Sequence, residues 1–509
     1  AHLDHRLFGC LQRHGDGQTV AAGDGDVRLV RYGDAGVADH AGERAQSHDA
    51  CAFAFSQPRR LVELAIWGVV AGVVFVCLWP ALWVDPLGVL GRMMEETFGK
   101  VEAGHLVFFM GQPTLDPGVW FYPYVIAFRL TPVVWLGLLL AAWATIWAAL
   151  THRRSTSANG PRVANQYPVP IAAPQLIAVS VLFAVGLFVF GLLSPKKQDR
   201  YLLALFPFLD LLAGWGLVWL GSHLHRRVAG VRRGTVAGVT IGAIAVAAHA
   251  YPVLTTYPYY LAYFNPLLGG LPRAIETTLV GWGEGMEHVA AFLNLQPQAA
   301  HETVAAVPAQ TLLPYYRGSG ENFYTNDVAL RADWVVLYIS QVQRLAPSPE
   351  IVRYFRAMQP EHVVNVLGVP YAWVYRGPKL ITTALPADAR PLDIALGDRL
   401  RLGGYAVAAD GTGVSVTLFW HVRHALETDY TVSVRLLDAG GRRVAQHDSW
   451  PANGLLPTHQ LRPGDIVRDV HPLAPDADAG GAAIEVVVYD AASGEALAAP
   501  VVIERAIHE

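Results

Sequence analysis

The chain has 509 residues, of which 53% are hydrophobic and 16% charged, with a mean hydropathy of +0.30 and a formal net charge of −4. Soluble domains carry about 25% charged residues, so this composition indicates a membrane protein with soluble parts. The near-neutral charge gives no argument for nucleic acid as a partner. The three cysteines, none of which follows Cys77, exclude an exported domain held by disulfides.

The first segment, residues 1–58, is rich in Asp, Gly, His, Arg and Ala and has no sustained helical or alternating period. We expect it to be a polar segment that is disordered or does not belong to the natural protein. The folded part of the chain is expected to begin at residue 59.

Five apolar runs follow, and each is close to the ~20 residues that cross a bilayer core. They lie at residues 64–84, 132–150, 173–193, 201–221 and 235–251. We expect the helices of the second and third runs to begin at Pro132 and near Pro174, where a missing N–H costs least. The fourth run contains Asp210, a carboxylate that serves either a function or a helix interface. Residues 59–251 therefore predict a transmembrane bundle of about five helices, with a long loop at 85–131.

Lysine and arginine counts in the short loops predict the orientation of this bundle. Three segments on one side are basic, through Arg59, Arg60, Arg153, Arg154, Arg162, Arg226, Arg227, Arg232 and Arg233. That side is expected to be the cytoplasm, so the loop 85–131, the turn 194–200 and everything after Tyr251 lie outside. The turn SPKKQDRY then carries three basic residues on the side where they are disfavoured.

The remaining residues predict two soluble domains. Residues 252–380 contain expected helices at 283–295 and 347–358, expected strands at 303–309 and 334–339 and an expected strand pair at 362–375, which favours an extracytoplasmic α/β domain. A Pro- and Ala-rich linker is expected at 381–391. Residues 392–509 hold alternating runs at 399–407, 413–422, 430–438 and 482–490, which indicate a β-sandwich. Trp420 is expected to be a core residue of this domain more readily than a platform for a sugar.

The basic turn is a candidate phosphate site. Arginine offers a bidentate fork and lysine a point charge, and Lys196, Lys197 and Arg200 stand together just before Tyr201. Tyr201 adds a hydroxyl or anchors the chain at the interface. The alternative is that these side chains only reach the membrane surface or touch anionic lipid without specificity.

Carboxylates in the loop 85–131 are candidates for proton transfer. Asp85 and Asp116 each precede a proline, and Glu102 and His105 share the loop. Asp before Pro is most often a turn former or a helix cap, so each is weak evidence by itself. A base that deprotonates an acceptor hydroxyl would be a carboxylate or a histidine placed here.

Four stretches resemble bacterial multi-spanning glycosyltransferases of the GT-C type. They are WPALWVDPLGVL, DPGVWFYPYVIAFRLTPVVWLGLLL, LLSPKKQDRYLLALFPFLDLLAGWGL and YPYYLAYFNPLLGG…LVGWGEGMEHVAAFLN. The resemblance is to protein O-mannosyltransferases and lipid A aminoarabinose transferase, which use polyprenyl-phosphate-linked sugars, and it covers roughly residues 61–380. It implies a bacterial plasma-membrane protein whose C-terminal domains lie outside, with Lys196, Lys197 and Arg200 at the lipid phosphate.

The chain also departs from that family. Family members have more helices, and their acidic catalytic residue lies in the first extracytoplasmic loop. We therefore expect the N-terminal helices and that residue to be missing, which leaves Asp116 and Asp85 as weak candidates for the base. In GWGEG, Trp282 could stack on a sugar and Glu284 bond its hydroxyls, or the stretch is a helix-start turn in which Glu284 favours the helix N-terminus.

The expected function is transfer of a sugar from a polyprenyl-phosphate carrier to an acceptor hydroxyl by this chain, which is the enzyme or its C-terminal part. The partners are the lipid bilayer, the lipid-linked sugar and an acceptor glycan, lipid or protein. No cofactor and no metal are expected. A non-catalytic, membrane-anchored envelope or glycan-binding protein is the main alternative, and a transporter is a weaker one.

Overall fold

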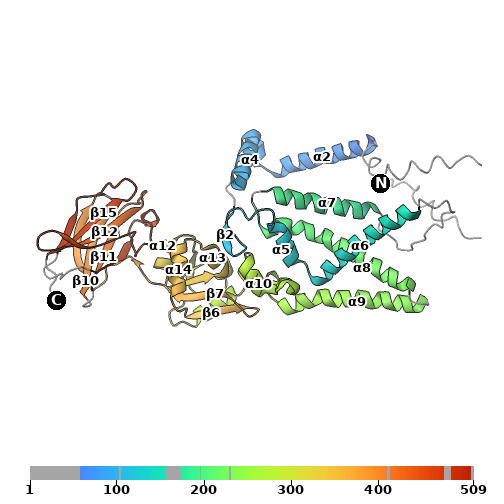
Figure 1. Ribbon diagram of the computed structural model, residues 1–509. Coiled ribbons are helices and arrows are strands. Elements are labelled where there is room, and N and C mark those ends of the chain that lie inside the picture. The colour runs from blue at the N-terminus through green and yellow to red at the C-terminus, as the bar shows by residue number, and fades with distance from the viewer. Residues whose placement is uncertain are drawn as a thin grey trace, which may run out of the picture. The chain divides into compact units, whose positions relative to one another are not determined.

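The computed structural model describes residues 58–102, 105–155, 174–194, 196–227, 231–409, 413–474 and 483–505 (Figure 1). The chain divides into two compact units, Ala1–Glu95 and Glu96–Glu509. Nearly all of the expected polar segment 1–58 lies outside the described residues. Only Pro58 is described, as the first residue of a helix.

The first apolar run does not form one long helix. It forms α2 (Pro58–Leu78) and the short α3 (Ala81–Val84), followed by α4 (Pro86–Glu102). The break falls at Trp79 and Pro80, because proline lacks an N–H and disfavours helical backbone in the residue before it. Helix α2 therefore ends at Leu78. The predicted helix at 64–84 was therefore wrong in its C-terminal end.

Among the described residues, four helices are long and apolar enough to cross a membrane, where five were expected. Their candidate spans are Pro132–Thr151, Leu176–Leu193, Asp199–Leu224 and Gly238–Thr256. The elements that carry them are α6 (Pro132–Ser155), α7 (Pro174–Leu193), η1 (Asp199–Leu205) with α8 (Phe206–Arg227), and α9 (Val231–Thr256). The predicted starts at Pro132 and near Pro174 are confirmed, since both prolines are first residues of helices.

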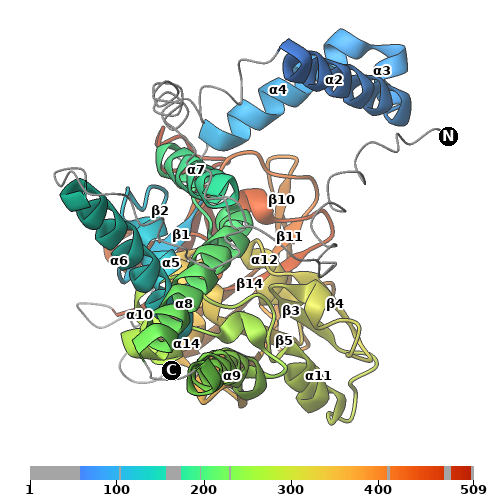
Figure 2. The ribbon, with the colours of Figure 1, turned by 90° about the vertical axis from the view of Figure 1, so that its right-hand side faces the viewer.

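Helices α6 and α8 lie side by side with their backbones in contact (Figures 1 and 2). A Cβ atom added at Gly137 would lie 2.5 Å from the carbonyl oxygen of Ala213, and one added at Gly216 would collide with the carbonyl oxygen of Gly137. Small residues at such an interface let two membrane helices approach closely and gain van der Waals contact. Glycine at these two positions thus fixes the separation of the pair.

Short elements cover one end of these helices. They are the hairpin β1 (Val107–Phe109) and β2 (Gln112–Thr114), α5 (Phe121–Arg129), η2 (Tyr260–Ala262), η3 (Pro266–Leu268) and α10 (Gly270–Thr277). The two hairpin strands are antiparallel and pair Val107 with Thr114 and Phe109 with Gln112. The loop 85–131 is therefore mostly regular structure.

A mixed five-stranded sheet follows, in the order β4-β3-β5-β7-β6. Its strands are β3 (Thr303–Ala306), β4 (Ser319–Asn322), β5 (Trp334–Tyr338), β6 (His362–Val366) and β7 (Val369–Arg376). Strands β3, β4 and β5 are parallel, and β7 is antiparallel to both β5 and β6. The helices and turns around it are α11 (Met286–Asn294), η4 (Ala309–Thr311), α12 (Asn326–Arg331), α13 (Ile339–Arg344) and α14 (Pro349–Ala357).

Both faces of this sheet are covered, which is why β5 is buried along its whole length. Val336 faces the side of α11, and Val335 and Leu337 face the side of α12 and α14, as the two-residue period of a strand requires. Helix α11 presents an apolar stripe of Met286, Val289, Ala290 and Leu293, all fully buried. Helix α14 starts with Ser348, whose hydroxyl accepts a hydrogen bond from Ile351 N at 3.3 Å.

The C-terminal strands form two antiparallel sheets around a shared core. One sheet has the order β8-β14-β11-β10-β9 and the other β13-β12-β15-β16. Their bounds are β8 (Ile381–Thr382), β9 (Arg390–Leu396), β10 (Leu400–Ala409), β11 (Val414–Val422), β12 (Tyr430–Leu437), β13 (Arg443–Ser449), η5 (Thr458–Gln460), β14 (Ile466–Leu473), β15 (Ala483–Asp490) and β16 (Val501–Arg505). Trp420 is fully buried and donates its indole N–H to Asp469 at 3.0 Å, which confirms it as a core residue.

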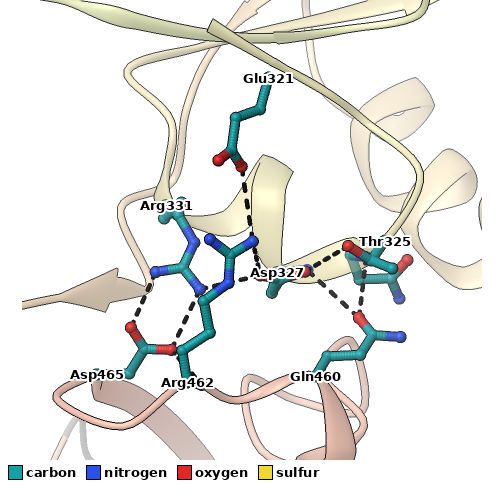
Figure 3. A network of polar contacts seen from close by, with 8 residues as sticks. Glu321, Thr325, Asp327, Arg331, Gln460, Arg462 and Asp465 are labelled. Carbon is teal, nitrogen blue, oxygen red and sulfur yellow. Dashed lines mark hydrogen bonds and ion pairs between the residues drawn. The ribbon is translucent and has the colours of Figure 1, made fainter.

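The mixed sheet and the paired sheets share one apolar core cluster and a polar junction beside it (Figure 3). Arg331 at the end of α12 binds Asp465, with Nη1 2.9 Å from Oδ1, and also Asp327, with Nη2 2.9 Å from Oδ2. Arg462 binds the same oxygen of Asp327 at 2.9 Å. We call Glu321, Asp327, Arg331, Arg462 and Asp465 the junction network; its opposite charges join the two parts of the chain.

Candidate anion-binding site

Three segments far apart in sequence meet at one end of the helices, and Arg129 joins them. Its Nη2 lies 3.0 Å from Oδ2 of Asp199 in the turn between α7 and α8. Its Nη1 donates to the carbonyl oxygens of Leu261 at 2.7 Å and Tyr263 at 3.1 Å. These bonds use the donors of Arg129 to hold the three segments together.

The hairpin β1–β2 is fastened to the segment before the mixed sheet. Met110 N donates to Thr277 O at 2.8 Å, and Phe109 forms an isolated bridge with Thr278. The Gln343 side chain of α13 then donates to Thr278 O at 2.9 Å and accepts from Val280 N at 3.0 Å. These bonds hold α13 against the hairpin that follows His105, so the positive charge of Arg344, the residue after Gln343, acts on His105.

The basic turn itself is folded around Lys197. This lysine is buried, and its Nζ donates to Ser194 O at 2.7 Å and lies 3.9 Å from Oδ1 of Asp116. Gln198 N donates to the hydroxyl of Tyr122 at 3.4 Å. Lys197 therefore satisfies part of its charge inside the protein and shapes the turn, whereas Lys196 is half-buried.

Arg200 and Tyr201 are exposed next to this turn. The guanidinium carbon of Arg200 lies 5.7 Å from the ring centroid of Tyr201 and 5.8 Å from that of Trp282. These distances suit cation–π attraction, in which the ring offers no full negative charge. In the part of the chain that the structure describes, no carboxylate lies within ion-pair distance of the Arg200 side chain.

His105 and Arg344 complete a group of basic residues from three segments. Burial first, and then the positive charges of Arg344, Lys196 and Arg200, lower the pKa of His105 from its ordinary value of 6.5. Burial also lowers the pKa of Arg344, whose Nε donates to Ser340 O at 3.0 Å. We call His105, Lys196, Arg200 and Arg344 the basic cluster. Such a concentration of donors is suited to a phosphate-like anion.

Sequence reasoning did not select Arg344. A single arginine in the last turn of a short helix ordinarily complements the helix dipole, and nothing in QVQRLAPSP distinguishes it. Its charge acts on His105 only because α13 packs against the hairpin. Lys196, Lys197 and Arg200 were selected because of the side of the membrane on which we expect them, and Lys196 and Arg200 lie in the cluster.

The carboxylates selected from the loop 85–131 are used locally. Asp85 belongs to the first compact unit, where its Oδ1 accepts from Gly88 N at 2.9 Å at the start of α4. Asp116 is exposed and accepts from Gly118 N at 2.9 Å, close to Lys197. Both therefore form the caps that Asp before Pro commonly forms. Glu102 ends α4, and its side chain lies outside the described part of the structure.

The GWGEG loop places Trp282 and Glu284 next to the basic cluster. Oε2 of Glu284 accepts from Trp282 N at 2.6 Å and from the hydroxyl of Tyr338 at 3.0 Å. Its Oε1 is buried and has no partner among the described residues. Burial, and next the charge of Glu284, raise the pKa of Tyr338, so this hydroxyl stays a donor. Trp282 thus connects a carboxylate on its backbone side to Arg200 on its ring side.

Asp210 has a histidine opposite it. Asp210 of α8 and His249 of α9 line one cavity of about 550 Å³, with apolar residues around them. His249 Nδ1 lies 3.2 Å from the hydroxyl of Thr131. Over the described ranges, no three His, Cys, Asp or Glu residues stand together as a metal site would need.

Comparison with protein-family models, with curated proteins and with solved structures found no match for this chain. The resemblance drawn from its motifs therefore depends on those motifs alone. Its function has to be argued from the geometry of the cluster.

Proposed function

We propose that this chain is a glycosyltransferase, or the C-terminal part of one, that takes its sugar from a polyprenyl-phosphate carrier at the outer face of a membrane. The observation that carries the proposal is the basic cluster at the end of four helices long and apolar enough to cross a membrane. A lipid-linked phosphate is an anion that stays at the membrane surface, near the ends of such helices, while its lipid chain remains in the bilayer.

The orientation follows from the lysine and arginine distribution. Arg153 and Arg154 lie in the last turn of α6, Arg226 and Arg227 end α8, and Arg232 and Arg233 lie in the first turn of α9. In the sequence, Arg162 follows α6. Cytoplasmic loops are enriched in such residues. The basic cluster and both C-terminal parts are therefore outside in this proposal.

The reaction we propose is a direct displacement at the anomeric carbon of the donor sugar. The bond from this carbon to the phosphate oxygen breaks, and a bond to the acceptor oxygen forms. The phosphate keeps the electron pair of the broken bond, and Arg200 and Lys196 stabilise its added charge. Lys197 holds the turn in shape, and the Tyr201 hydroxyl donates to the phosphate.

A base must accept the proton of the acceptor hydroxyl. Asp116 is the exposed carboxylate near Lys197, so we assign it this role. Glu284, next to Trp282, is assigned to the sugar hydroxyls, with the ring of Trp282 stacked on the sugar. His105 lies among the cations and is assigned to the phosphate side.

A second function is favoured by one observation. The carboxylates of Asp85 and Asp116 both cap nearby backbone N–H groups, which is sufficient reason for their presence. A membrane-anchored protein that binds a lipid-linked or envelope glycan without catalysis needs the basic cluster but no base.

Transfer should be measured with the full chain in lipid nanodiscs and a panel of polyprenyl-phosphate-linked hexoses, pentoses and amino sugars. Arg200→Glu should lower transfer more than about tenfold, the scale of losing one charged contact to a developing oxyanion. Arg353→Glu, at an exposed arginine of α14, is the matched control and should keep transfer within twofold.

Equal transfer by wild type and Arg200→Glu would refute the phosphate assignment. Binding of the donors without transfer, in wild type and Asp116→Asn alike, would instead favour the non-catalytic protein.

A further inference from the structure

A cavity of about 670 Å³ lies at the junction between the mixed sheet and the paired sheets. Its walls come from the first residues of β3, from β4, from the end of α12 and from the chain on either side of β8. This volume falls in the range of about 300–1000 Å³ that small-molecule sites have in proteins. None of its lining residues belongs to the basic cluster or to the GWGEG loop, so the proposed transfer does not use it.

The charged residues that line the cavity are each paired within the protein. Lys379 Nζ lies 2.7 Å from Oδ1 of Asp333. Arg331 binds the two aspartates of the junction network, and Glu321 lies 3.6 Å from Arg462 (Figure 3). An ion that entered the cavity would lose its water without gaining an uncompensated charge on the wall. The wall therefore favours an uncharged ligand.

Asp333 and Lys379 form one side of the cavity. Oδ2 of Asp333 accepts from both N and Oγ1 of Thr303, each at 2.8 Å, which leaves Oδ1 for Lys379. Burial would raise the pKa of Asp333, but the hydrogen bonds from Lys379 and Thr303 lower it, so this carboxylate stays ionised. The lysine ammonium has three N–H donors and its side chain is 47% exposed, so donors remain for ligand oxygens.

Hydroxyl groups and apolar surface make up the rest of the wall. Ser319 and Thr383 are exposed, and each hydroxyl both donates and accepts hydrogen bonds. The Glu321 carboxylate is 57% exposed and adds an acceptor. Three buried apolar residues also line the cavity: Val304, Val328 and Ile381. Donors, acceptors and apolar surface are thus all present within one cavity.

We propose that this cavity binds an uncharged mono- or disaccharide unit, at a site separate from the proposed reaction centre. A sugar hydroxyl both donates and accepts, so it pairs with the ammonium of Lys379, the carboxylate of Glu321 and the wall hydroxyls alike. The C–H groups of the sugar ring cover the apolar surface. No aromatic side chain lines the cavity in the described part of the chain, so binding depends on hydrogen bonds and is weak, in the millimolar range.

The saccharide would contact both sides of the junction. Ser319 and Glu321 belong to β4 of the mixed sheet, whereas β8 pairs with β14 of the paired sheets. A ligand that binds only the folded state stabilises the elements that it contacts. Hydrogen exchange at the amides of β4 and β8 should therefore slow when the sugar is bound.

Binding should be measured with the full chain in phosphatidylcholine nanodiscs, by saturation-transfer difference NMR, which detects millimolar ligands. The probes are glucose, mannose and galactose, each with its uronic acid and its amino sugar as charged counterparts, together with lactose and the uncharged peptide acetyl-Gly-Gly-amide. We expect at least one uncharged sugar to bind about fivefold or more tightly than its charged counterparts, because the wall charges are already paired.

Two variants fill the cavity from opposite sides of the junction. Thr383→Trp and Ser319→Trp each place a large ring at an exposed wall residue, and each should weaken sugar binding at least tenfold. Ala491→Trp, in an exposed turn after β15, is the matched control and should change binding less than twofold. Lys379→Met should weaken binding about threefold by removing the ammonium donors. Arg200→Glu should leave it within twofold.

Failure of every uncharged sugar to bind the wild-type chain, or tightest binding by a charged sugar or by the peptide, overturns this inference. Binding that both Trp variants at the wall leave unchanged also overturns it. Loss of binding in Arg200→Glu does the same, since the sugar would then lie at the basic cluster. Arg200→Glu tests the proposed function and the wall variants test this cavity, so a failure of one proposal is distinguishable from a failure of the other.

Discussion

The junction network and the basic cluster both gather arginines from distant parts of the chain, but they treat the charge in opposite ways. At the junction, burial alone would lower the pKa of Arg331, while the hydrogen bonds and charges of Asp465 and Asp327 raise it. In the cluster, burial lowers the pKa of Arg344, and no carboxylate offsets this within the described residues. Paired arginines hold two parts of a protein together; unpaired ones are ready for a ligand.

The largest effect should come from removing the shared carboxylate of the junction. Asp327→Asn leaves Arg331 and Arg462 without their common partner, and Asp327 is only 2% exposed. Breaking a buried ion pair costs about 3 kcal/mol or more, so we expect a clear fall in the unfolding temperature of the C-terminal parts. Thermal unfolding of the full chain, with hydrogen exchange at α12, measures this. Glu321→Gln, at an exposed partner of Arg462, should cost less than about 1 kcal/mol.

The next effect is the stabilisation of the folded chain by a phosphate ligand, which should depend on the basic cluster and not on the junction network. Farnesyl phosphate at 100 times its dissociation constant should stabilise the wild-type chain by about 2.7 kcal/mol. Asp327→Asn should keep this gain on a lower baseline, and Arg200→Glu should lose most of it without being less stable itself. The same unfolding experiment measures both. If Arg200→Glu unfolds as early as Asp327→Asn, then Arg200 is structural and the contrast between the two sites is wrong.

The smallest effect concerns a half-buried histidine, His447, that is bonded to a second histidine. His447 Nδ1 lies 2.9 Å from Nδ1 of His471, which is itself bonded to Asp469 at 2.8 Å. Burial, and then the charge of His471, lower the pKa of His447, against the opposing charges of Asp469 and Asp448. The unfolded chain therefore takes up this proton at a higher pH than the folded chain.

It follows that the stability from neutral His447 is complete above pH 6.5 and declines as the pH falls through its lowered folded value. The decline should be below about 1 kcal/mol, because the side chain is partly exposed to solvent and screened. Comparing unfolding at pH 7.5 and pH 5 in wild type and His447→Gln isolates it, with His424→Gln as an exposed control. A decline of equal size in all three proteins would show that other groups cause it.

Most regular elements could be predicted because their patterns reflect local physics. The apolar stripe of α11 and the alternation in β11 and β12 indicate their structure directly. Apolarity alone misled at Trp79 and Pro80, where the run continues but the helix does not. The hairpin β1–β2 was missed because each strand has three residues and β2 contains Pro113.

The candidate site was predicted only in the part that is contiguous in sequence. Lys196 and Arg200 stand close together, so their shared location was visible. The packing of α13 against the hairpin was not visible in the sequence, and neither was the bond from Lys197 to Ser194 that turns this lysine inward. The roles of Asp116 and Glu284 remain predictions, since their contacts suit turn formation as well as chemistry.

The glycine contact between α6 and α8 has a mechanical consequence for the cluster. Because the two backbones touch at Gly137 and Gly216, neither helix can rotate or slide without a collision. Arg200 lies in η1, which runs directly into α8, and Arg129 lies just before α6. The turn that carries Arg200 is therefore attached to a stiff pair of helices.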